Sequence, residues 1–228
     1  MVLTLYGFSV PGYPVSTCTT RVAVTLHEKK VPFNFISVDL QKGEHTTAEY
    51  TEKQPFQQIP YIVEDDGFTL NEARAINRYI AIKYADQGTP GLVPPSDDLK
   101  ALAKFDQAVS VEMTNFDSLM ARIVYEGPIK ELLGLEGDRG LIKTLMEQAG
   151  PKLDAYERIL SKQKYLAGND LTIADLHHLP TDELLPLIGL DTLDNPAHPS
   201  VARWWNEIRS RPAWKAVKEG FSSVEKYD

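Results

Sequence analysis

The chain has 228 residues, of which 43% are hydrophobic and 25% are charged, and its formal net charge is −8. This composition is that of an ordinary globular protein, and the length suits one large domain or two small ones. The acidic balance argues against nucleic acid or an anionic membrane as the main partner, and no apolar run reaches the roughly 18 residues of a membrane span. The single cysteine, Cys18, cannot form an internal disulfide and fits a reducing compartment. We therefore expect a cytosolic protein that acts on small molecules.

The first part of the chain alternates strand-like and helix-like patterns. Strands are expected at residues 2–8 and 31–40, and as a hairpin around Asp66-Gly67 at residues 61–65 and 68–70. Helices are expected at residues 17–29, 47–53 and 72–85, the last with a clear apolar face. The order βαβ, α, ββ, α is that of a thioredoxin-like α/β domain, which we expect to span residues 1–86.

The composition and the hydrophobic pattern of the sequence change after this domain. Residues 87–97 are rich in proline and glycine and are expected to form a linker. Beyond the linker no strand is convincing, and helices are expected at residues 98–126, 138–163, 172–189 and 199–219. Residues 98–228 should therefore form an all-α helical-bundle domain. Thr172 and Asp175 stand at capping-box spacing, which indicates the start of a buried helix and no chemistry.

The segment PVSTCTTRV, residues 14–22, joins the first strand to the first helix. Unpaired N–H groups at a helix N-terminus can stabilise an anion. Ser16 or Thr17 can be the N-cap, and satisfying backbone donors is a sufficient role for such a residue. The alternative is that a hydroxyl donates a hydrogen bond to a bound thiolate. A free thiol has a pKa of about 8.5, and one donor with the helix dipole can lower it by about one or two units.

Two further segments could complete a binding site. In QPFQQIPYIV, residues 54–63, a cis proline at Pro60 would leave the backbone of Ile59 free to pair with a peptide-like ligand. In LNEARAI, residues 70–76, a strand runs into a helix whose N-terminus carries Glu72. That helix start is a second candidate anion site, although an acidic residue in a first turn is favourable by itself.

Together, in this order and spacing, these segments resemble the glutathione transferase family, most closely the phi class of plants and fungi. The likeness includes the S-T-x-x-x-R-V helix start at residues 16–22, LHEKKVPF and DLQKGEH, QPF-x-Q-[IV]-P and E-[SA]-R-A-I. Later, LAGNDLTIADL (166–176) and RWWNEIRSRPAWK (203–215) resemble the C-terminal half of the family. The resemblance covers the whole chain.

The resemblance assigns a role to each segment. It implies that Ser16 donates a hydrogen bond to the glutathione thiolate. The expected glutathione-binding residues are His45 at the glycine end, Gln58, Ile59 and Pro60 along the cysteinyl and γ-glutamyl parts, and Glu72 with the N–H of Ala73 at the γ-glutamyl amine and carboxylate. The family usually has serine where this chain has Ala73, and losing one charge-assisted hydrogen bond costs about 1.5–3 kcal/mol. Thr46 also replaces a common lysine, and the loop at residues 7–15 is longer than usual.

Three residues compete with Ser16 for the thiolate. Tyr6 ends the first strand, where other transferase classes place a catalytic tyrosine. Cys18 could form a mixed disulfide with glutathione, although cysteine-dependent relatives place the thiol at position 16 and Cys18 should turn into the helix. Thr17 could substitute in part, although branching restricts its rotamers.

The second substrate should bind in an apolar pocket between the domains. By analogy we expect its lining to be Phe8, Tyr13, Phe35, Phe116, Met120 and Tyr125. An aromatic residue at helical spacing is more often part of a core. No metal is expected, because the adjacent pair His177-His178 points in directions about 100° apart and has no further Cys or His at i+4.

The expected protein is a cytosolic, homodimeric enzyme that adds the glutathione thiolate to hydrophobic electrophiles, with glutathione as its co-substrate. Accessory peroxidase activity would be compatible with the same chemistry. The first alternative is a hydrophobic-ligand carrier of the same fold, which Ala73 favours and the intact Ser16, Gln58 and Glu72 disfavour. A protein-interaction module is the second alternative.

Overall fold

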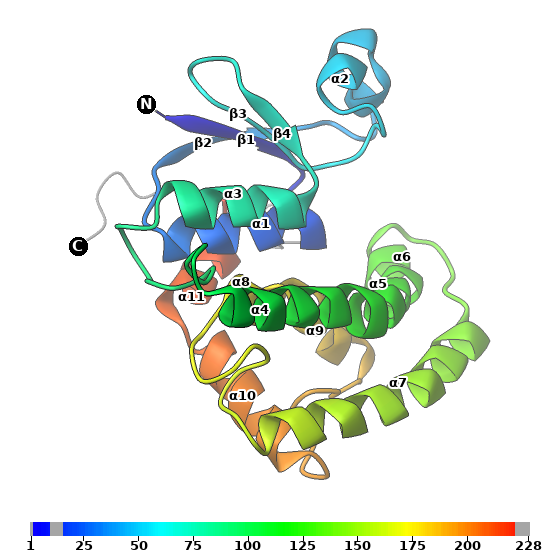
Figure 1. Ribbon diagram of the computed structural model, residues 1–228. Helices are drawn as coiled ribbons and strands as arrows, with labels where there is room; N and C mark the ends of the chain where they lie inside the picture. Colours follow the sequence, from blue (N-terminus) through cyan, green and yellow to red (C-terminus); the bar gives the residue numbers. More distant parts are fainter. Residues whose placement is uncertain (1, 10–15, 222–228) are drawn as a thin grey trace. The chain divides into compact units, whose positions relative to one another are not determined.

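Figure 1 shows the computed structural model of the chain, which describes residues 2–9 and 16–221. The chain divides into two compact units, Met1–Pro90 with Pro212–Asp228, and Gly91–Arg211. We call these unit 1 and unit 2. The division places the last helix in unit 1, whereas the sequence analysis assigned residues 98–228 to one domain. Helical periodicity identifies a helix but not the surface that it covers, so no pattern in the sequence predicts that the last helix packs in unit 1.

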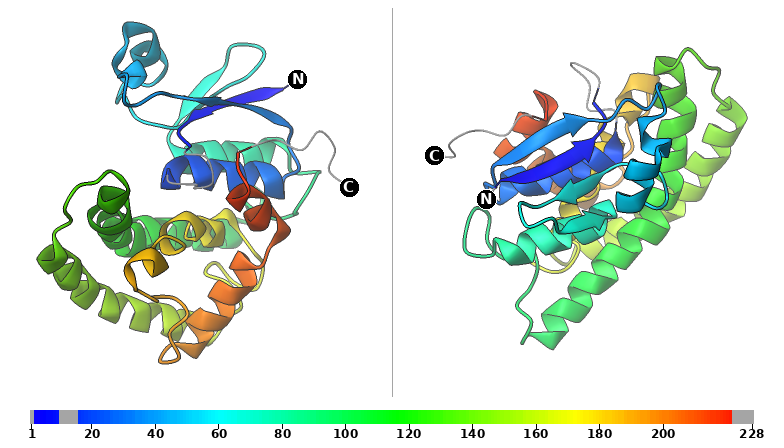
Figure 2. Two further views of the ribbon diagram at one scale, coloured as in Figure 1. Left: turned by 180° about the vertical axis from the view of Figure 1, so that it is seen from behind. Right: turned by 90° about the horizontal axis from the view of Figure 1, so that it is seen from above.

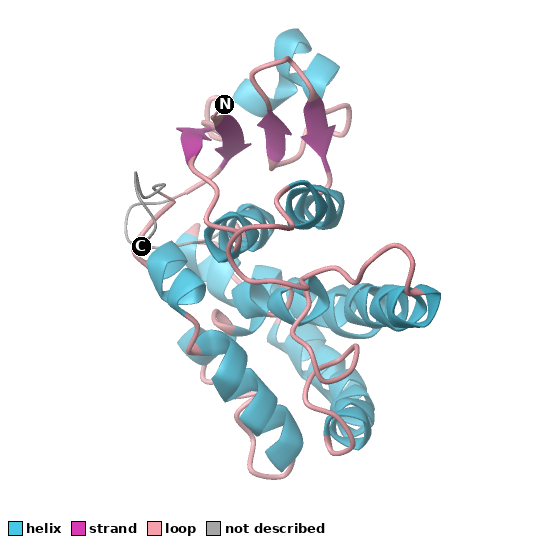
Figure 3. Ribbon diagram, turned by 60° about the vertical axis from the view of Figure 1, so that its left-hand side comes forward, coloured by secondary structure: helices cyan, strands magenta, loops and turns pink. Residues whose placement is uncertain are grey.

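Unit 1 has a four-stranded sheet with helices on both faces (Figures 1 and 3). Its elements are β1 (Leu3–Gly7), α1 (Thr17–Glu28), β2 (Phe33–Ser37), the 3-10 turn η1 (Glu44–Thr46), α2 (Ala48–Lys53), β3 (Tyr61–Val63), β4 (Thr69–Asn71), α3 (Ala73–Lys83) and α11 (Pro212–Lys218). Apart from α11, the elements follow the predicted order, and the strand ends lie within three residues of the predicted ones.

The strand order is β2-β1-β3-β4. Strand β1 pairs in parallel with β2, so a helix must connect them, and this helix is α1. Strands β3 and β4 form the antiparallel hairpin, and β3 is also antiparallel to β1. The sheet is therefore mixed, as in a thioredoxin-like domain.

Helix α1 is buried on nearly every side, because it packs against α3 and α11 as well as the sheet. Val22, Val24 and Leu26 have no exposed surface. The side-chain amide of Asn77 in α3 donates to the Arg21 carbonyl at 3.1 Å, which ties the two helices together. A helix enclosed in this way holds its N-terminus in a fixed position, and that end carries Ser16.

Unit 2 is helical throughout the part that the structure describes. Its elements are α4 (Leu99–Val111), η2 (Glu112–Asp117), α5 (Ser118–Val124), η3 (Tyr125–Ile129), α6 (Lys130–Leu132), α7 (Arg139–Leu160), α8 (Ile173–Leu176), α9 (Leu179–Asp182), η4 (Leu185–Ile188) and α10 (Pro199–Arg209). The elements from α4 to α6 form one rod, and α7 packs back against α5 (Figure 2).

Prolines explain where the helices of this part differ from the sequence prediction. The rod widens to π-helical turns at η2 and η3, and Pro128 lies inside η3, where its missing N–H removes a helical hydrogen bond. The expected single helix at residues 172–189 is three short ones, with Pro180 and Pro186 in the first turns of the second and third. The expected helix at 199–219 ends at Arg209, and Pro212 begins α11.

Within the part of the chain that the structure describes, no helix is both long enough and apolar enough to cross a bilayer.

Candidate active site

The strand register gathers the predicted binding residues at one edge of the unit 1 sheet. Tyr6 in β1 is opposite Tyr61 in β3, and Tyr61 is opposite Asn71 in β4. The residues that adjoin these three positions on the same edge are Gly7, Pro60 and Glu72. The N-termini of α1 and α3 therefore arise at one edge, and their unpaired N–H groups make it suitable for an anionic ligand.

Ser16 is the N-cap of α1, with extended backbone angles (φ −84°, ψ 98°). Its Oγ accepts a hydrogen bond from the N–H of Thr19 at 3.3 Å and lies 2.8 Å from Thr19 Oγ1. The side chain is partly exposed, so a ligand can reach it. The hydroxyl thus combines a capping role with access to a bound group, which the sequence analysis had treated as alternatives.

The peptide bond between Ile59 and Pro60 is cis, as the sequence analysis expected. Gln58 is exposed, Ile59 is half-buried and Pro60 is buried. Among the described residues, none forms a hydrogen bond with the backbone N–H or C=O of Ile59. These groups are placed beside β3 and are available to pair with the backbone of a peptide-like ligand.

Tyr50 supports this segment from α2. Its hydroxyl donates to the Gln58 carbonyl at 2.7 Å, and its ring packs edge-on against Tyr61 at 5.1 Å. Burial raises the pKa of Tyr50 to about 12 and raises that of Tyr61 as well. The Tyr50 phenol therefore remains protonated, and a donor, throughout the neutral pH range.

We expect Tyr50→Phe to raise the dissociation constant for glutathione about three- to tenfold, because one hydrogen bond that fixes the Gln58 carbonyl is worth about 1 kcal/mol. Isothermal titration with glutathione measures the effect, and it should not vary between pH 6 and 8, since about two pH units still separate the upper limit from the start of phenol ionisation. Tyr79→Phe is the matched control, because the Tyr79 hydroxyl interacts with Lys83, at 3.2 Å, and with Glu64, and neither is a predicted glutathione contact. An unchanged affinity in Tyr50→Phe would remove Tyr50 from the site.

Glu72 has backbone angles that are unusual for a residue with a side chain (φ 68°, ψ 106°). Such a conformation costs about 1–3 kcal/mol, and where it occurs it often marks a functional site. It is held on one side by the pairing of Asn71 with Tyr61 and on the other by the Ile76 N–H, which donates to the Glu72 carbonyl at 2.9 Å. The Glu72 side chain is exposed, and the next residue, Ala73, is 6% exposed as the first residue of α3.

His45 lies in the 3-10 turn η1 and is half-buried. Its Nδ1 is enclosed and has no hydrogen-bond partner within the described ranges 2–9 and 16–221. A polar atom in this situation is suited to a ligand or to water. The structure is thus compatible with the predicted contact to the glycine end of glutathione, which stays a prediction.

Comparison with known proteins decides the family. Residues 1–82 match the glutathione S-transferase N-terminal domain, and residues 88–212 match the glutathione S-transferase C-terminal domain. The chain belongs to the glutathione S-transferase family. The resemblance read from the sequence and the two-part fold class are therefore confirmed, and the protein is an enzyme of this family.

Individual relatives agree with this assignment. The chain is 42% identical over 195 residues to glutathione S-transferase PM239X14 of Arabidopsis thaliana. These residues cover 85% of this chain and 88% of the relative. It is 40% identical to glutathione transferase F7 from Populus trichocarpa, whose crystal structure matches with a TM-score of 0.83 over 97% of this chain and 100% of the other. Glutathione S-transferase I from maize, in complex with an atrazine glutathione conjugate, is 29% identical, with a TM-score of 0.82 over 96% and 97% of the two chains. The letter F in the names of relatives such as glutathione S-transferase F10 of Arabidopsis thaliana and F7 of Populus trichocarpa denotes the phi class, and this class is thereby confirmed.

Two of the three rivals to Ser16 have other roles in this transferase. The ring of Tyr6 stacks on Tyr61 at 4.5 Å, in a cluster with Tyr50 of α2. Helix α2 lies on the sheet face opposite α1 (Figure 3). Because Tyr6 packs against the cluster that contains Tyr50 of α2, its ring lies on that face and not on the face of α1. Cys18 lies inside α1, where its Sγ accepts a hydrogen bond from Arg21 Nη1 at 3.6 Å. Thr17 is the first residue of α1 and is partly exposed, so it remains a neighbour of the site.

The residues expected for the second substrate have unequal surroundings. Phe116 and Met120 are 2% and 1% exposed, and the Phe116 ring packs against His178 at 4.5 Å and Tyr156 at 6.2 Å within unit 2. They are buried here because an apolar residue at helical spacing packs inward against neighbouring helices. A substrate contact for either residue stays a prediction.

The other expected substrate residues are more accessible. Phe8 is half-buried at the site edge, Tyr125 is 51% exposed, and Phe35 is half-buried with its ring 5.1 Å from that of Phe221. Tyr13, with most of the loop at residues 7–15, lies outside the described residues. A substrate contact for Phe8, Phe35, Tyr13 and Tyr125 stays a prediction.

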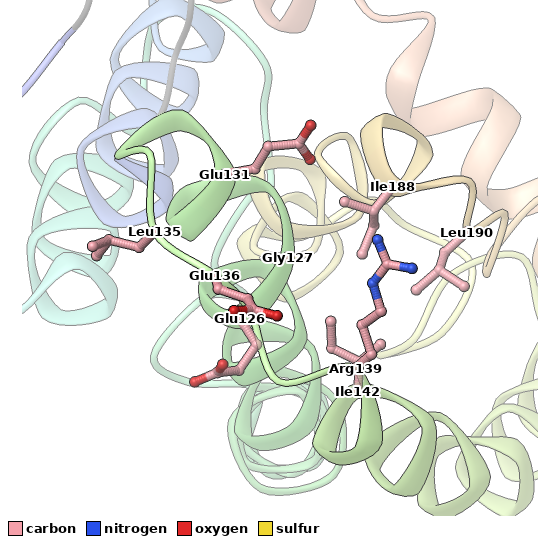
Figure 4. A pocket seen from close by; sticks show the side chains of 10 residues that line it. Glu126, Gly127, Glu131, Leu135, Glu136, Arg139, Ile142, Ile188 and Leu190 are labelled. Atoms are coloured by element: carbon pink, nitrogen blue, oxygen red, sulfur yellow. The ribbon is translucent and has the colours of Figure 1, made fainter.

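Unit 2 contains a pocket of about 630 Å³ beside η3 and the start of α7 (Figure 4). Its walls combine charged side chains with apolar ones: Glu126, Glu131, Glu136, Arg139, Leu135, Ile142, Ile188 and Leu190, with Gly127 and Gly137. Glu126 is already paired with Lys130 at 2.6 Å. None of the expected substrate residues that the structure describes lines it, and its charged walls do not match the apolar site that the sequence predicts. No group of His, Cys, Asp and Glu within residues 2–9 and 16–221 is arranged to hold a metal ion.

Sequence reasoning missed two residues at this site, Thr19 and Tyr50. Both support a predicted residue from behind, and both are single polar side chains on helices with no motif of their own. Thr19 stands at i+3 from an N-cap, which is the position that meets the cap side chain, so helix geometry could have indicated it. Tyr50 is joined to Gln58 only by the path of the loop between them, and no sequence pattern predicts that path.

Proposed function

We propose that this transferase binds glutathione at the edge of the unit 1 sheet and adds its thiolate to hydrophobic electrophiles. Residues 1–86 are the glutathione-binding domain in this proposal, and residues 98–228 contribute to the site of the second substrate. The observation that carries it is the Ser16 hydroxyl, partly exposed at the N-terminus of a buried helix. That position supplies one O–H donor together with the positive end of the α1 dipole.

The chemistry required of the protein is modest. A thiol with a pKa of about 8.5 is only a few per cent ionised at neutral pH, so lowering the pKa of the bound thiol increases the nucleophile directly. A donor and a helix N-terminus act on the charged form alone, which is the condition for catalysis by electrostatic stabilisation. Holding the electrophile beside the thiolate supplies the remaining acceleration through proximity.

The remaining contacts fit the parts of glutathione. Glu72 and the N–H of Ala73 would bind the γ-glutamyl amine and carboxylate, the Ile59 backbone and Gln58 would hold the central part, and His45 would meet the glycine carboxylate. The maize relative in complex with an atrazine glutathione conjugate supports an apolar second substrate. No metal takes part in the proposed reaction.

Conjugation of glutathione to chlorodinitrobenzene tests the proposal, with glutathione binding measured separately by calorimetry. Turnover that saturates with glutathione would support conjugation. Binding of glutathione or of a hydrophobic dye without turnover would instead support the carrier. Failure to bind glutathione at all would overturn both.

The alanine at position 73 favours a hydrophobic-ligand carrier as the second candidate function. It occupies the first position of α3, where a serine hydroxyl could add one hydrogen bond to the γ-glutamyl carboxylate. We expect Ala73→Ser to tighten glutathione binding about tenfold, because a hydrogen bond to a charged group contributes about 1.5 kcal/mol or more. Ala75→Ser, on the exposed side of the same helix, is the matched control. Equal affinities for wild type and Ala73→Ser would show that the backbone N–H already suffices.

The setting of the enzyme is also part of the proposal. A cytosolic location fits the single cysteine and the acidic surface, and a C2 homodimer fits the usual symmetry of soluble oligomers. Light scattering from the purified protein measures the oligomeric state, and a mass of one chain would exclude the dimer.

A further inference from the structure

We propose that Thr19 is a positioning residue for the reaction: its hydroxyl donates to Ser16 Oγ and thereby directs the Ser16 proton toward the glutathione thiolate. The inference rests on the proposed function and concerns the group behind Ser16 rather than Ser16 itself. Thr19 is fully buried in α1, has no contact with solvent, and is linked to Ser16 by two hydrogen bonds.

The hydroxyls of Ser16 and Thr19 belong to one series of hydrogen bonds. Ser16 Oγ and Thr19 Oγ1 are 2.8 Å apart, and either atom can be the donor. The Thr19 N–H donates to Ser16 Oγ at 3.3 Å. On the other side, the N–H of Phe8 donates to Thr19 Oγ1 at 3.3 Å. A row of groups therefore runs from the end of β1 through Thr19 to Ser16.

Each hydroxyl has one proton to donate and two lone pairs that accept. If Ser16 donates to Thr19, its proton is used inside the protein and cannot stabilise a thiolate. If Thr19 donates instead, Ser16 Oγ accepts from the N–H and the O–H of Thr19, and its own proton is free for the ligand. A bound thiolate, which can only accept, selects this second arrangement.

The second arrangement also makes Ser16 a stronger donor. Consecutive hydrogen bonds polarise one another. A hydroxyl that accepts two hydrogen bonds therefore donates a stronger one through its own proton. The row starts at a backbone N–H, which can only donate, so its direction from Phe8 toward Ser16 is favoured. The thiolate would lie at the end of this row.

Gly7 keeps Thr19 in this place. A Cβ atom at Gly7 would lie only 2.6 Å from Thr19 Oγ1, closer than such atoms approach in proteins. The end of β1 thus fits against the Thr19 side chain because residue 7 has none. The close approach is what brings the neighbouring Phe8 N–H within reach of Thr19 Oγ1.

The test separates the hydroxyl of Thr19 from its methyl group. Thr19→Val keeps the shape and removes the hydroxyl, and Thr19→Ser keeps the hydroxyl and removes the methyl. The readout is the pKa of glutathione bound to each protein, from the ultraviolet absorbance of the thiolate across a pH series, together with the pH profile of kcat/KM. We expect Thr19→Val to raise this pKa by about one unit, which lowers the thiolate fraction about three- to eightfold at neutral pH, and this loss is recovered at high pH. Thr19→Ser should stay within about twofold of wild type.

Thr25→Val is the matched control. Thr25 is also fully buried in α1, and its hydroxyl donates to the Arg21 carbonyl at 3.4 Å, away from Ser16. It reports the effect of losing a buried threonine hydroxyl from the same helix, and it should leave the pKa of bound glutathione unchanged.

The outcomes distinguish this inference from the proposed function. A wild-type complex that holds glutathione only as the thiol near neutral pH would overturn both. A wild-type complex with a lowered thiol pKa that Thr19→Val leaves unchanged would overturn the role of Thr19 alone. The role would also fall if Thr19→Ser raised the pKa as much as Thr19→Val, or if Thr25→Val did so, because packing of α1 would then be the cause. If Thr19→Val does not fold, Thr19→Ala compared with Thr19→Ser makes the same test, because both lack the methyl group and only Thr19→Ser keeps the hydroxyl.

Discussion

Ser16→Ala should lower kcat/KM for glutathione conjugation about 100-fold at neutral pH, equivalent to about 2.7 kcal/mol of transition-state stabilisation. The substitution removes the only hydroxyl that caps α1 at the site edge. Without this donor, the pKa of bound glutathione should rise toward that of the free thiol, so the lost rate should return in part as the pH is raised. The dissociation constant for glutathione should change little, because Ser16 is expected to contact sulfur alone.

The fold itself should survive this change. Loss of an N-cap side chain costs about 1 kcal/mol, and α1 is held by its packing against α3 and α11. Rates at several pH values, calorimetry and a thermal melt measured on one preparation separate the three effects. Ser118→Ala is the matched control, since its hydroxyl donates at 2.7 Å to the Thr114 carbonyl in its own helix.

A Ser16→Ala variant that kept most of its activity would exclude the serine as the thiolate's partner. Thr17 would then be the remaining hydroxyl at the helix start. Tyr6 would not replace it, because its ring is stacked on Tyr61 on the other sheet face. A loss of affinity as large as the loss of rate would point to a general disruption of the α1 N-terminus.

The sequence predicted the parts of this protein that depend on local pattern. Strand and helix periods, the Asp66-Gly67 turn and the Thr172 capping box each arise from residues near one another in the chain, and each is found in the structure. The same reasoning overestimated helix length in the second half, because a hydrophobic period continues through Pro180, Pro186 and Pro212 although the helices do not. At these prolines the hydrophobic pattern predicts a continuous helix, but the missing backbone N–H interrupts the helical hydrogen bonds, so the helix ends.

The site was predictable where a residue acts through its position on a helix or turn. Ser16 and Glu72 follow from the starts of helices, and cis-Pro60 from the segment around it. Tyr50, which supports Gln58, and Gly7, which makes room for Thr19, depend on which surfaces meet after folding. That pairing is fixed by the register of distant strands and by packing, neither of which one sequence records.

Asp175 joins three segments of unit 2 through one buried carboxylate. It has no exposed surface and accepts four hydrogen bonds. Leu166 N–H and Trp204 Nε1 each donate to Oδ1 at 2.9 Å, while Thr172 donates to Oδ2 through its N–H at 3.0 Å and its hydroxyl at 3.1 Å. The capping residue of α8 therefore also holds α10 and the loop that follows α7.

Asp175→Ala should destabilise the protein by about 4 kcal/mol, because it leaves buried donors from all three segments without an acceptor. For a chain of this size the midpoint of thermal unfolding should fall by about 10 °C. Circular dichroism during thermal and urea unfolding measures both quantities. Glutathione affinity at a temperature where the variant is folded should remain near that of wild type, since the glutathione contacts proposed above all come from unit 1.

Asp175→Asn and Asp170→Ala make the prediction specific. Asparagine keeps one oxygen acceptor and turns an amide N–H₂ toward donors. Asp175→Asn should therefore lower the free energy of unfolding by about half as much as Asp175→Ala. Asp170 is exposed in the same loop, and its removal should change stability by less than about 0.5 kcal/mol. If Asp175→Ala melted within a few degrees of wild type, the four donors would have found water, and the carboxylate would be a helix cap rather than the junction of three segments.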